Sequence, residues 1–233
     1  MEILRQIKDS LLHLAFPHVC EACGSDILNS HHFICARCLT ELPETNFHLH
    51  PNNPIEKMFW GRIPFTHASS QYYFTKESMM QHLMHSFKYR GNKELGFYLG
   101  QLMGELLSES NRFRFVDALV PLPLFASKER KRGYNQATVL CEGIASVLNK
   151  PVLAKVITRT NYTESQTRKS RIERWMNMEG RFRLKEPEMV RDKHILLVDD
   201  VVTTGATLEA CAKELLKAEN ILLSLATLCF SSH

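Results

Sequence analysis

Two adjacent carboxylates, Asp199 and Asp200, follow an apolar run near the end of this 233-residue chain. The run reads as a buried strand, and the rest of the stretch 194–215, "HILLVDDVVTTGATLEACAKEL", reads as a loop and a helix. A strand-to-helix connection needs a turn residue and an N-cap, and two neighbouring negative charges repel each other. We therefore expect a bound partner to use this acid pair.

Threonines surround a single glycine in the loop that follows the acids. Loop amides, threonine hydroxyls and a helix N-terminus together suit an anion such as a phosphate monoester. The candidates are Thr203, Thr204, Gly205, Ala206 and Thr207. The chain has neither the G-x-x-x-x-G-K-[ST] loop of nucleoside triphosphatases nor the G-x-G-x-x-G of dinucleotide folds, so we expect a ligand other than a triphosphate.

Carboxylates beside a phosphate site suit a sugar phosphate. They accept hydrogen bonds from vicinal hydroxyls, and a 5-phosphorylated ribose carries both groups about one sugar ring apart. Mg²⁺ favours carboxylate and substrate oxygens, and it would offset the repulsion between Asp199 and Asp200. The residues thus predict a ribose 5-phosphate compound bound with magnesium.

A basic cluster precedes the acids in the chain. Within five residues it contains Lys128, Arg130, Lys131 and Arg132. Such a cluster can bind anions, and arginine does so with two parallel hydrogen bonds. The alternative interpretation is a run of charged residues that only faces solvent. The cluster follows a strand that ends in proline and precedes a helix, and this position favours the anion site.

Four cysteines near the front, Cys20, Cys23, Cys35 and Cys38, have the spacing C-x2-C-x11-C-x2-C. Two such pairs place four thiolates around one zinc, which predicts a closed, structural site. Disulfides and a redox pair are the weaker explanations, and His31 or His32 is an alternative ligand. We expect the isolated Cys141, Cys211 and Cys229 to be buried thiols.

The elements that must position these residues alternate along the chain. Strands are predicted at 69–74, 117–124, 151–158, from 194 and at 221–230, and helices at 76–91, 94–110, 135–150, 170–178 and after 205. Such alternation favours an α/β fold with a mostly parallel sheet and flanking helices, whose ligands bind beyond the carboxyl ends of the strands.

The chain divides into four parts by pattern. We expect an amphipathic lead helix at 1–16, the zinc module at 17–43, a connector at 44–66 and the α/β domain at 67–233, with 67–116 as candidate hood and helices. The net charge of +4 is too mild to indicate nucleic-acid binding by itself. No apolar run reaches the roughly 18 residues of a membrane span, so we expect a cytoplasmic protein.

Several motifs carry a family resemblance. Residues 195–207, "ILLVDDVVTTGAT", resemble the phosphoribosyl-pyrophosphate (PRPP) motif of type I phosphoribosyltransferases. The cysteine module, "KYRGNKELG", "VPLPLFASKERKRGYNQA" and "ESQTRKSRIERWMNMEGRF" resemble, in that order, the ComF (ComFC) family of competence-associated proteins. Many relatives carry a further cysteine pair where this chain has "HLHPNNP" at 48–54, so a second metal, with or without the histidines there, is left open.

The resemblance implies a role for each motif. Asp199 and Asp200 would be the catalytic pair that binds the ribose 2- and 3-hydroxyls, and residues 203–207 would bind the 5-phosphate. Lys131, Arg132 and Gly133 would meet the diphosphate. The segment 161–175 corresponds to the flexible loop that closes over substrate, with Gln166, Arg168, Lys169, Arg171 and Arg174 as its candidate residues.

Two functions follow from these implications. The first is magnesium-dependent transfer of ribose 5-phosphate from PRPP to an unidentified acceptor, with release of diphosphate. The alternative is a non-catalytic PRPP-binding protein that binds single-stranded DNA, assists competence, and uses Tyr134 and Trp175 as stacking residues. The sequence predicts no binding partner for the basic segment Lys88, Tyr89 and Arg90. It also predicts no oligomeric state.

Overall fold

A computed structural model describes residues 18–26, 32–160 and 181–231 of the chain. The lead helix expected at 1–16 and the flexible-loop residues Gln166, Arg168, Lys169, Arg171 and Arg174 lie outside these ranges, as does Trp175. None of the helices within the described ranges is both long enough and apolar enough to cross a membrane.

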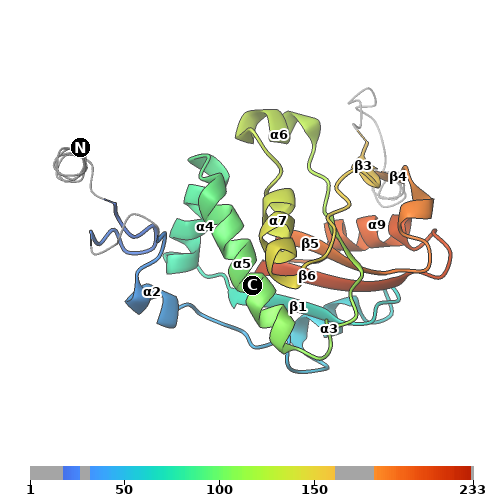
Figure 1. Ribbon diagram of the computed structural model, residues 1–233, viewed down its shortest axis with the longest axis horizontal. Helices are drawn as coiled ribbons and strands as arrows, with labels where there is room; N and C mark the ends of the chain where they lie inside the picture. The colour runs from blue at the N-terminus through green and yellow to red at the C-terminus, as the bar shows by residue number, and fades with distance from the viewer. Residues whose placement is uncertain (1–17, 27–31, 161–180, 232–233) are drawn as a thin grey trace, which may run out of the picture.

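Four parallel strands form the central sheet (Figure 1). They are β1 (Ala68–Tyr73), β2 (Ala118–Pro121), β5 (His194–Val202) and β6 (Leu222–Phe230). Their order in the sheet is β1-β6-β5-β2, and each neighbouring pair is parallel. The predicted parallel sheet with flanking helices is confirmed.

A small antiparallel ribbon stands apart from the main sheet. It consists of β3 (Ile157–Arg159) and β4 (Phe182–Leu184), and a 3-10 helix, η1 (Pro187–Met189), follows it. The strand predicted at 151–158 is therefore wrong for most of its length. Only Val152 forms an isolated parallel bridge, with Leu119 of β2, because the chain leaves the main sheet after it.

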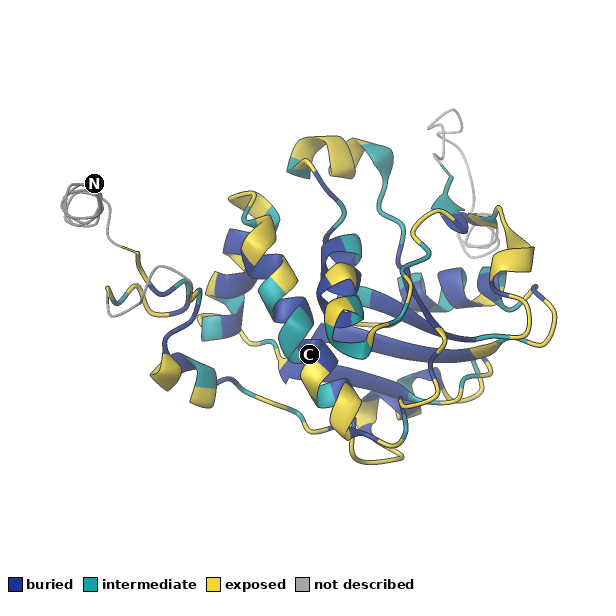
Figure 2. Ribbon diagram, viewed as in Figure 1, coloured by how far each residue is buried: buried dark blue, intermediate teal, exposed yellow. Residues whose placement is uncertain are grey.

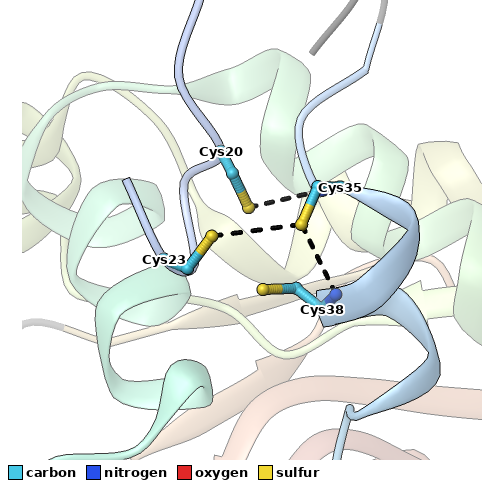
Figure 3. A group of neighbouring side chains, drawn as sticks. All are labelled: Cys20, Cys23, Cys35 and Cys38. Carbon is cyan, nitrogen blue, oxygen red and sulfur yellow. Dashed lines mark hydrogen bonds between the residues drawn. The ribbon is translucent and has the colours of Figure 1, made fainter. Parts of the chain in front are cut away.

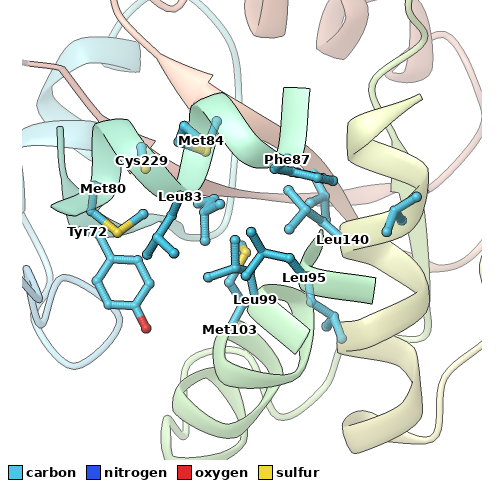
Figure 4. Packing of buried hydrophobic residues seen from close by; sticks show 14 of the residues in the cluster. Tyr72, Met80, Leu83, Met84, Phe87, Leu95, Leu99, Met103, Leu140 and Cys229 are labelled. Carbon is cyan, nitrogen blue, oxygen red and sulfur yellow. The ribbon is translucent and has the colours of Figure 1, made fainter. Parts of the chain in front are cut away.

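Three helices cover one face of the sheet: α4 (Met79–Tyr89), α5 (Lys93–Glu109) and α7 (Gln136–Leu148). Polar side chains begin them, since Ser78, Asn92 and Asn135 each accept a hydrogen bond from an amide of the first turn. Their apolar faces meet in the core drawn in Figure 4, around residues such as Phe87, Leu99 and Leu140.

Glycines let α5 and α7 approach each other closely. A Cβ atom on Gly100 would stand 2.4 Å from the Leu140 carbonyl oxygen, and one on Gly143 would stand 2.2 Å from the Phe97 carbonyl oxygen. Side chains at these positions would force the two helix backbones apart. The packing of α7 fixes the end of the loop that leads out of β2.

The other face is covered by α9 (Ala206–Leu215) and the shorter α3 (Pro54–Phe59). The segment predicted as a connector thus contains a helix, capped by Asn53, whose Ile55 and Phe59 are fully buried in this second core. Figure 2 shows the strands buried between the two helical layers. Cys141, Cys211 and Cys229 are buried, as predicted.

Two elements lie outside the layers. Helix α2 (Ala36–Thr40) belongs to the cysteine module, and α6 (Ala126–Arg132) projects from the carboxyl end of β2 and buries none of its residues (Figures 1 and 2). The basic cluster predicted to bind anions lies in α6, which ends at Gly133, whose φ is +82°. A left-handed residue of this kind favours glycine and ends a helix.

Candidate functional site

The acid pair lies at the carboxyl end of β5, in the middle of the sheet. Asp199 is in register with Thr227 of β6, and Asp200 follows it along the strand. Both side chains are partly buried, in contrast to the fully buried run from Ile195 to Val198. The apolar residues before the acids therefore anchor the strand in the core, and the carboxylates occupy the edge where parallel α/β sheets bind ligands.

Two positive charges, those of Lys88 and Arg159, act on the acid pair. Lys88 Nζ, in the last turn of α4, lies 2.9 Å from Asp200 Oδ2. The guanidinium of Arg159, at the end of β3, acts on Asp199. Lys88 acts on Asp199 as well, so positive charge reaches the acid pair from both α4 and β3.

Asp199 has an unusual affinity for its proton. Burial, and after it the negative charge of Asp200, raises the pKa of Asp199 to about 8. The Asp200 amide, which donates to Asp199 Oδ1 at 2.8 Å, and the charges of Lys88 and Arg159 oppose this rise in pKa. An acid that is protonated at neutral pH in the free protein is ready to lose its proton when a cation arrives.

Arg159 is held by aromatic rings. Its guanidinium carbon lies 3.7 Å from the ring centroid of Phe125 and 5.2 Å from that of Phe182. Burial, and then the charge of Arg181, lowers the pKa of Arg159. Its Nε atom is buried and has no hydrogen-bond partner among the described residues. No sequence pattern predicts a role for Arg159, because its position depends on two aromatic residues far from it in the chain.

The candidate phosphate loop joins β5 to α9. Thr203 and Thr204 are exposed, Ala206 and Thr207 are partly buried, and Gly205 caps α9 with a φ of +73°. No side chain within the described ranges caps this helix, although Thr204 Oγ1 lies 3.5 Å from the Ala206 amide nitrogen. The first amides of α9 are therefore available to an anion, at the end of the helix that favours negative charge.

Arg62 fastens this loop to the segment that precedes β1. Its Nη1 donates to the carbonyl oxygens of Thr204 and Met58, both at 3.0 Å, and its Nε donates to Glu209 Oε2 at 2.9 Å. The same guanidinium thus contacts the phosphate loop and the first turn of α9. Sequence reasoning missed Arg62, because it lies in a stretch that reads as a connector about 140 residues earlier.

The basic segment borders the same edge of the sheet. Lys131 and Gly133 are exposed, whereas Arg132 donates to Gln136 Oε1 at 2.6 Å and lies 5.6 Å from the ring centroid of Tyr89. Tyr89 follows Lys88 directly, so α6 approaches the end of α4 that contacts Asp200. The structure therefore brings Arg132 to the side of the acid pair where Lys88 lies.

Tyr134 does not have the exposure that a stacking residue needs. Its side chain is buried, its hydroxyl donates to the Phe87 carbonyl oxygen, and Lys93 Nζ lies 5.2 Å from its ring centroid. The prediction that Tyr134 stacks on nucleic-acid bases is wrong. The exposed aromatic residue nearby is Tyr89, which packs against the ring of His85 with centroids 5.3 Å apart.

The four-cysteine cluster can hold a metal ion (Figure 3). The Sγ atoms of Cys20, Cys23, Cys35 and Cys38 all lie within 4.8 Å of one another, and those of Cys23 and Cys35 are 3.9 Å apart. Thiolates at zinc–sulfur distance around a tetrahedral zinc stand about 3.8 Å apart. Within the described ranges these cysteines form the one group of three or more His, Cys, Asp or Glu side chains close enough to hold a metal ion, and His32, His48 and His50 do not join it.

Backbone amides support the thiolate form of Cys20, whereas burial raises the pKa of Cys38. The Cys35 amide donates to Cys20 Sγ at 3.3 Å. Burial raises the pKa of Cys20, but hydrogen bonds from the amides of Cys35, Cys23 and Ala22 outweigh it and lower the pKa to about 7. Cysteine binds metals as the thiolate, so this donor set fits a soft divalent ion.

Known proteins are similar to the C-terminal part of the chain and to most of its length. Residues 134–233 match the phosphoribosyl transferase domain. "DNA utilization protein YhgH" of Salmonella typhimurium is 28% identical over 215 residues, which cover 88% of this chain and 93% of that protein. "Competence protein F" of Haemophilus influenzae is 26% identical over 88% of this chain and 87% of its own length, and "Competence protein ComFC" of Bacillus subtilis is 29% identical over 86% and 72%.

Two solved structures resemble part of the chain. The glutamine PRPP amidotransferase of B. subtilis, complexed with ADP and GMP, has a TM-score of 0.39 at 14% identity over 56% of this chain and 25% of that one. A hypothetical protein from Neisseria gonorrhoeae with bound ppGpp has a TM-score of 0.39 at 20% identity over 57% of this chain and 66% of its own. The matched part thus spans less than two thirds of either structure.

Proposed function

Because the chain is a homologue of Competence protein F and ComFC and contains a phosphoribosyl transferase domain, we propose that it binds PRPP and transfers its ribose 5-phosphate to an acceptor. The observation that carries this proposal is the continuity of β5, the acid pair, the threonine loop and the uncapped N-terminus of α9. Carboxylates followed along the chain by an anion site match ribose 5-phosphate, whose hydroxyls and phosphate lie about one sugar ring apart.

Each part of the site has a role in this proposal. Asp199 and Asp200 accept hydrogen bonds from the ribose 2- and 3-hydroxyls, and Thr203 to Thr207 bind the 5-phosphate. Lys131, Arg132 and Gly133, at the end of α6, bind the diphosphate. Arg132 supports this assignment, since it lies over the ring of Tyr89, the residue that follows Lys88 in α4.

The residues around the acid pair fit a divalent ion. Asp199 and Asp200 offer oxygen ligands, which Mg²⁺ prefers, and Mg²⁺ would supply charge compensation for the diphosphate. Arg159 and Lys88 keep the two carboxylates close to positive charge while the site is free of ligand. For the cysteine cluster we propose zinc in a structural role, because four thiolates leave no open coordination position.

Catalysis in such a site requires positioning and charge stabilisation. When diphosphate leaves the ribose C1, positive charge develops on the sugar and negative charge on the leaving group. Asp199 and Asp200 hold the sugar hydroxyls, and the basic residues of α6 hold the diphosphate. The acceptor attacks C1 from the face opposite the diphosphate and transfers its proton to the solvent or to the diphosphate. Because the acceptor displaces the diphosphate directly, no covalent intermediate with the protein is needed.

Calorimetry of PRPP with and without Mg²⁺ tests the proposal. The wild-type protein should bind PRPP with Mg²⁺, and an Asp199→Asn/Asp200→Asn double variant should lose at least tenfold in affinity. Glu188→Gln and Asp192→Asn, two exposed acids away from the site, serve as controls. Absence of PRPP binding by the wild type would overturn the proposal, and release of diphosphate with candidate amines would identify the acceptor class.

A second function has its own observation in its favour: the exposed stack of His85, Tyr89 and Arg132 at the end of α4. An exposed aromatic ring beside cations suits the bases and backbone of single-stranded DNA. In this alternative the chain binds PRPP without turnover and assists DNA uptake, a role suggested by the names of its relatives.

Two variants together separate the functions. Tyr89→Ala should weaken binding of a fluorescent oligothymidine roughly tenfold, whereas Asp199→Asn/Asp200→Asn should weaken PRPP binding and leave oligothymidine binding unchanged. Phe115→Ala is a matched control, because Phe115 is also exposed and has Arg114 5.9 Å from its ring centroid. Equal oligonucleotide affinity in wild type and Tyr89→Ala would exclude this stack as the DNA site.

A further inference from the structure

Glu21 lies between two cysteines of the metal cluster, Cys20 and Cys23, yet its carboxylate contacts the helical layer of the α/β domain. Its Oε2 accepts a hydrogen bond from Ser86 Oγ at 2.8 Å, and its Oε1 accepts one from Asn92 Nδ2 at 2.9 Å. Both partners are far from Glu21 in sequence. One carboxylate thus bridges the cysteine module and two elements of the domain.

The two partners of Glu21 stand on either side of the turn between α4 and α5. Ser86 is buried in the last turns of α4, and its carbonyl oxygen accepts the amide of Arg90, which ends that helix. Asn92 caps α5 by accepting the Leu95 amide at 3.0 Å. Glu21 therefore fastens the end of one helix to the beginning of the next.

Lys88 lies inside the segment that Glu21 fastens. It is two residues after Ser86 and four before Asn92, and its Nζ forms the 2.9 Å ion pair with Asp200. A shift in the last turn of α4 would move this amine relative to the carboxylate. The position of Lys88 thus depends on the hydrogen bonds that Glu21 accepts.

The shape of the cysteine turn keeps Glu21 in place. The Glu21 amide donates to the Phe33 carbonyl oxygen at 2.9 Å, and the Gly24 amide donates to that of Cys20 at 2.7 Å. One ring nitrogen of His82, in α4, lies 3.2 Å from the Ala22 carbonyl oxygen. The turn thus rests along α4, and a segment this short depends on its metal for a fixed conformation.

We infer that Glu21 is a positioning residue that connects the four-cysteine metal module to Lys88, so that metal in the module sets the geometry of the acid pair. The cluster then acts on ligand binding without contacting the ligand. In the proposed sugar-phosphate complex Asp200 would hold a divalent ion, and Lys88 would be free to pair with the diphosphate. The ligand half of this inference rests on the proposed PRPP binding.

Reactivity of the Lys88 amine tests the connection without any ligand. Brief acetylation of the full chain, followed by peptide mass spectrometry, measures Lys88 against the exposed Lys217. Glu21→Ala and Ser86→Ala should each raise relative labelling of Lys88 at least threefold, and chelation of the metal from wild type should do the same. Glu41→Ala is the control, since Glu41 lies in the same module but pairs with the exposed Arg37.

Affinity for PRPP then tests whether Glu21 affects ligand binding through Lys88. With metal content verified at one ion per chain, Glu21→Ala should weaken PRPP binding about fivefold, as should Lys88→Met. The double variant should bind no more weakly than Lys88→Met alone, because Glu21 acts through that lysine. A merely structural role for Glu21 would lower stability in both backgrounds and give additive losses of affinity.

The outcomes separate the two proposals. Unchanged Lys88 labelling in both Glu21→Ala and Ser86→Ala overturns the inference, as do additive losses of PRPP affinity. Increased labelling in a protein whose wild type binds no PRPP supports the connection and overturns the proposed function. A metal-free wild type with unchanged Lys88 labelling shows that the module does not set this geometry, and so also overturns the inference.

Discussion

Lys88 and Asp200 form an ion pair across the carboxyl edge of the sheet, with Nζ 2.9 Å from Oδ2. Each side chain is less than one-fifth exposed, and they come from α4 and β5 respectively. The amine occupies the space beside the carboxylate where a cation would bind. A lysine and a divalent ion therefore compete for Asp200.

Replacing Lys88 should strengthen binding of a divalent ion by itself. Lys88→Met removes the competing charge, and a partly exposed pair contributes roughly 1 kcal/mol, which corresponds to about a fivefold increase in affinity. Mn²⁺ titration followed by water-proton relaxation measures this affinity. Lys93→Met is the matched control, because Lys93 lies over the Tyr134 ring instead of beside the acids. Weaker Mn²⁺ binding by Lys88→Met would exclude Asp200 as a ligand.

Ligand binding should release a proton from Asp199. Burial, and then Asp200, raises the pKa of Asp199 from 3.8 to about 8, so the folded protein keeps a proton there from about pH 4 to 8 that the unfolded chain has lost. The resulting contribution to stability is full below pH 4 and is lost as the pH rises through 8. A bound Mg²⁺ requires the ionised form, so affinity for Mg²⁺ and PRPP should rise with pH up to about 8.

Calorimetry in two buffers with different heats of ionisation counts this proton. At pH 7 we expect close to one proton released per Mg²⁺–PRPP complex formed by the wild type. Asp199→Asn should release none and should show a flatter dependence of stability on pH between 4 and 8. Equal proton release by both proteins would mean that another group titrates.

Local motifs made half of the site predictable from sequence. Asp199, Asp200 and residues 203–207 lie within one stretch of nine residues, and their order along strand, loop and helix determines their arrangement. The cysteine spacing likewise predicted a cluster that the structure contains. In both cases the functional side chains and the helix, strand or turn that positions them lie within about twenty residues of sequence.

Residues that act from a distance were not predictable in this way. Arg62 and Arg159 reach the site through contacts with Thr204 and Phe125, which no periodicity reveals. Lys88 was recognised as basic, but its partner is 112 residues away along the chain. Tyr134 read as an accessible aromatic residue because it follows a basic run, whereas packing against α4 buries it.

Loss of Arg62 should loosen the phosphate loop. Arg62→Gln removes the contacts with the Thr204 carbonyl oxygen and with Glu209, and charged hydrogen bonds contribute about 1.5–3 kcal/mol. We expect ribose 5-phosphate affinity to fall about tenfold, with KM raised more than kcat is lowered in any PRPP-dependent reaction. Lys213→Gln is the control, since Lys213 also pairs with Glu209 but is largely exposed and is not among the side chains that hold Thr204. Equal effects of the two substitutions would assign the loss to Glu209 alone.

Gly205→Ala should destabilise the fold at the phosphate loop. The residue has a φ of +73°, and an added Cβ would lie 2.8 Å from Met58 Sδ and from two ring atoms of Phe59. A left-handed non-glycine residue costs roughly 1–2 kcal/mol, and the fully buried Phe59 has little room to move. Urea denaturation should show at least this loss, whereas Gly133→Ala, with a φ of +82° and open space around its Cβ, should show only the backbone cost. Equal losses in the two variants would mean that α3 yields freely, and that its packing does not fix the loop to which the 5-phosphate is proposed to bind.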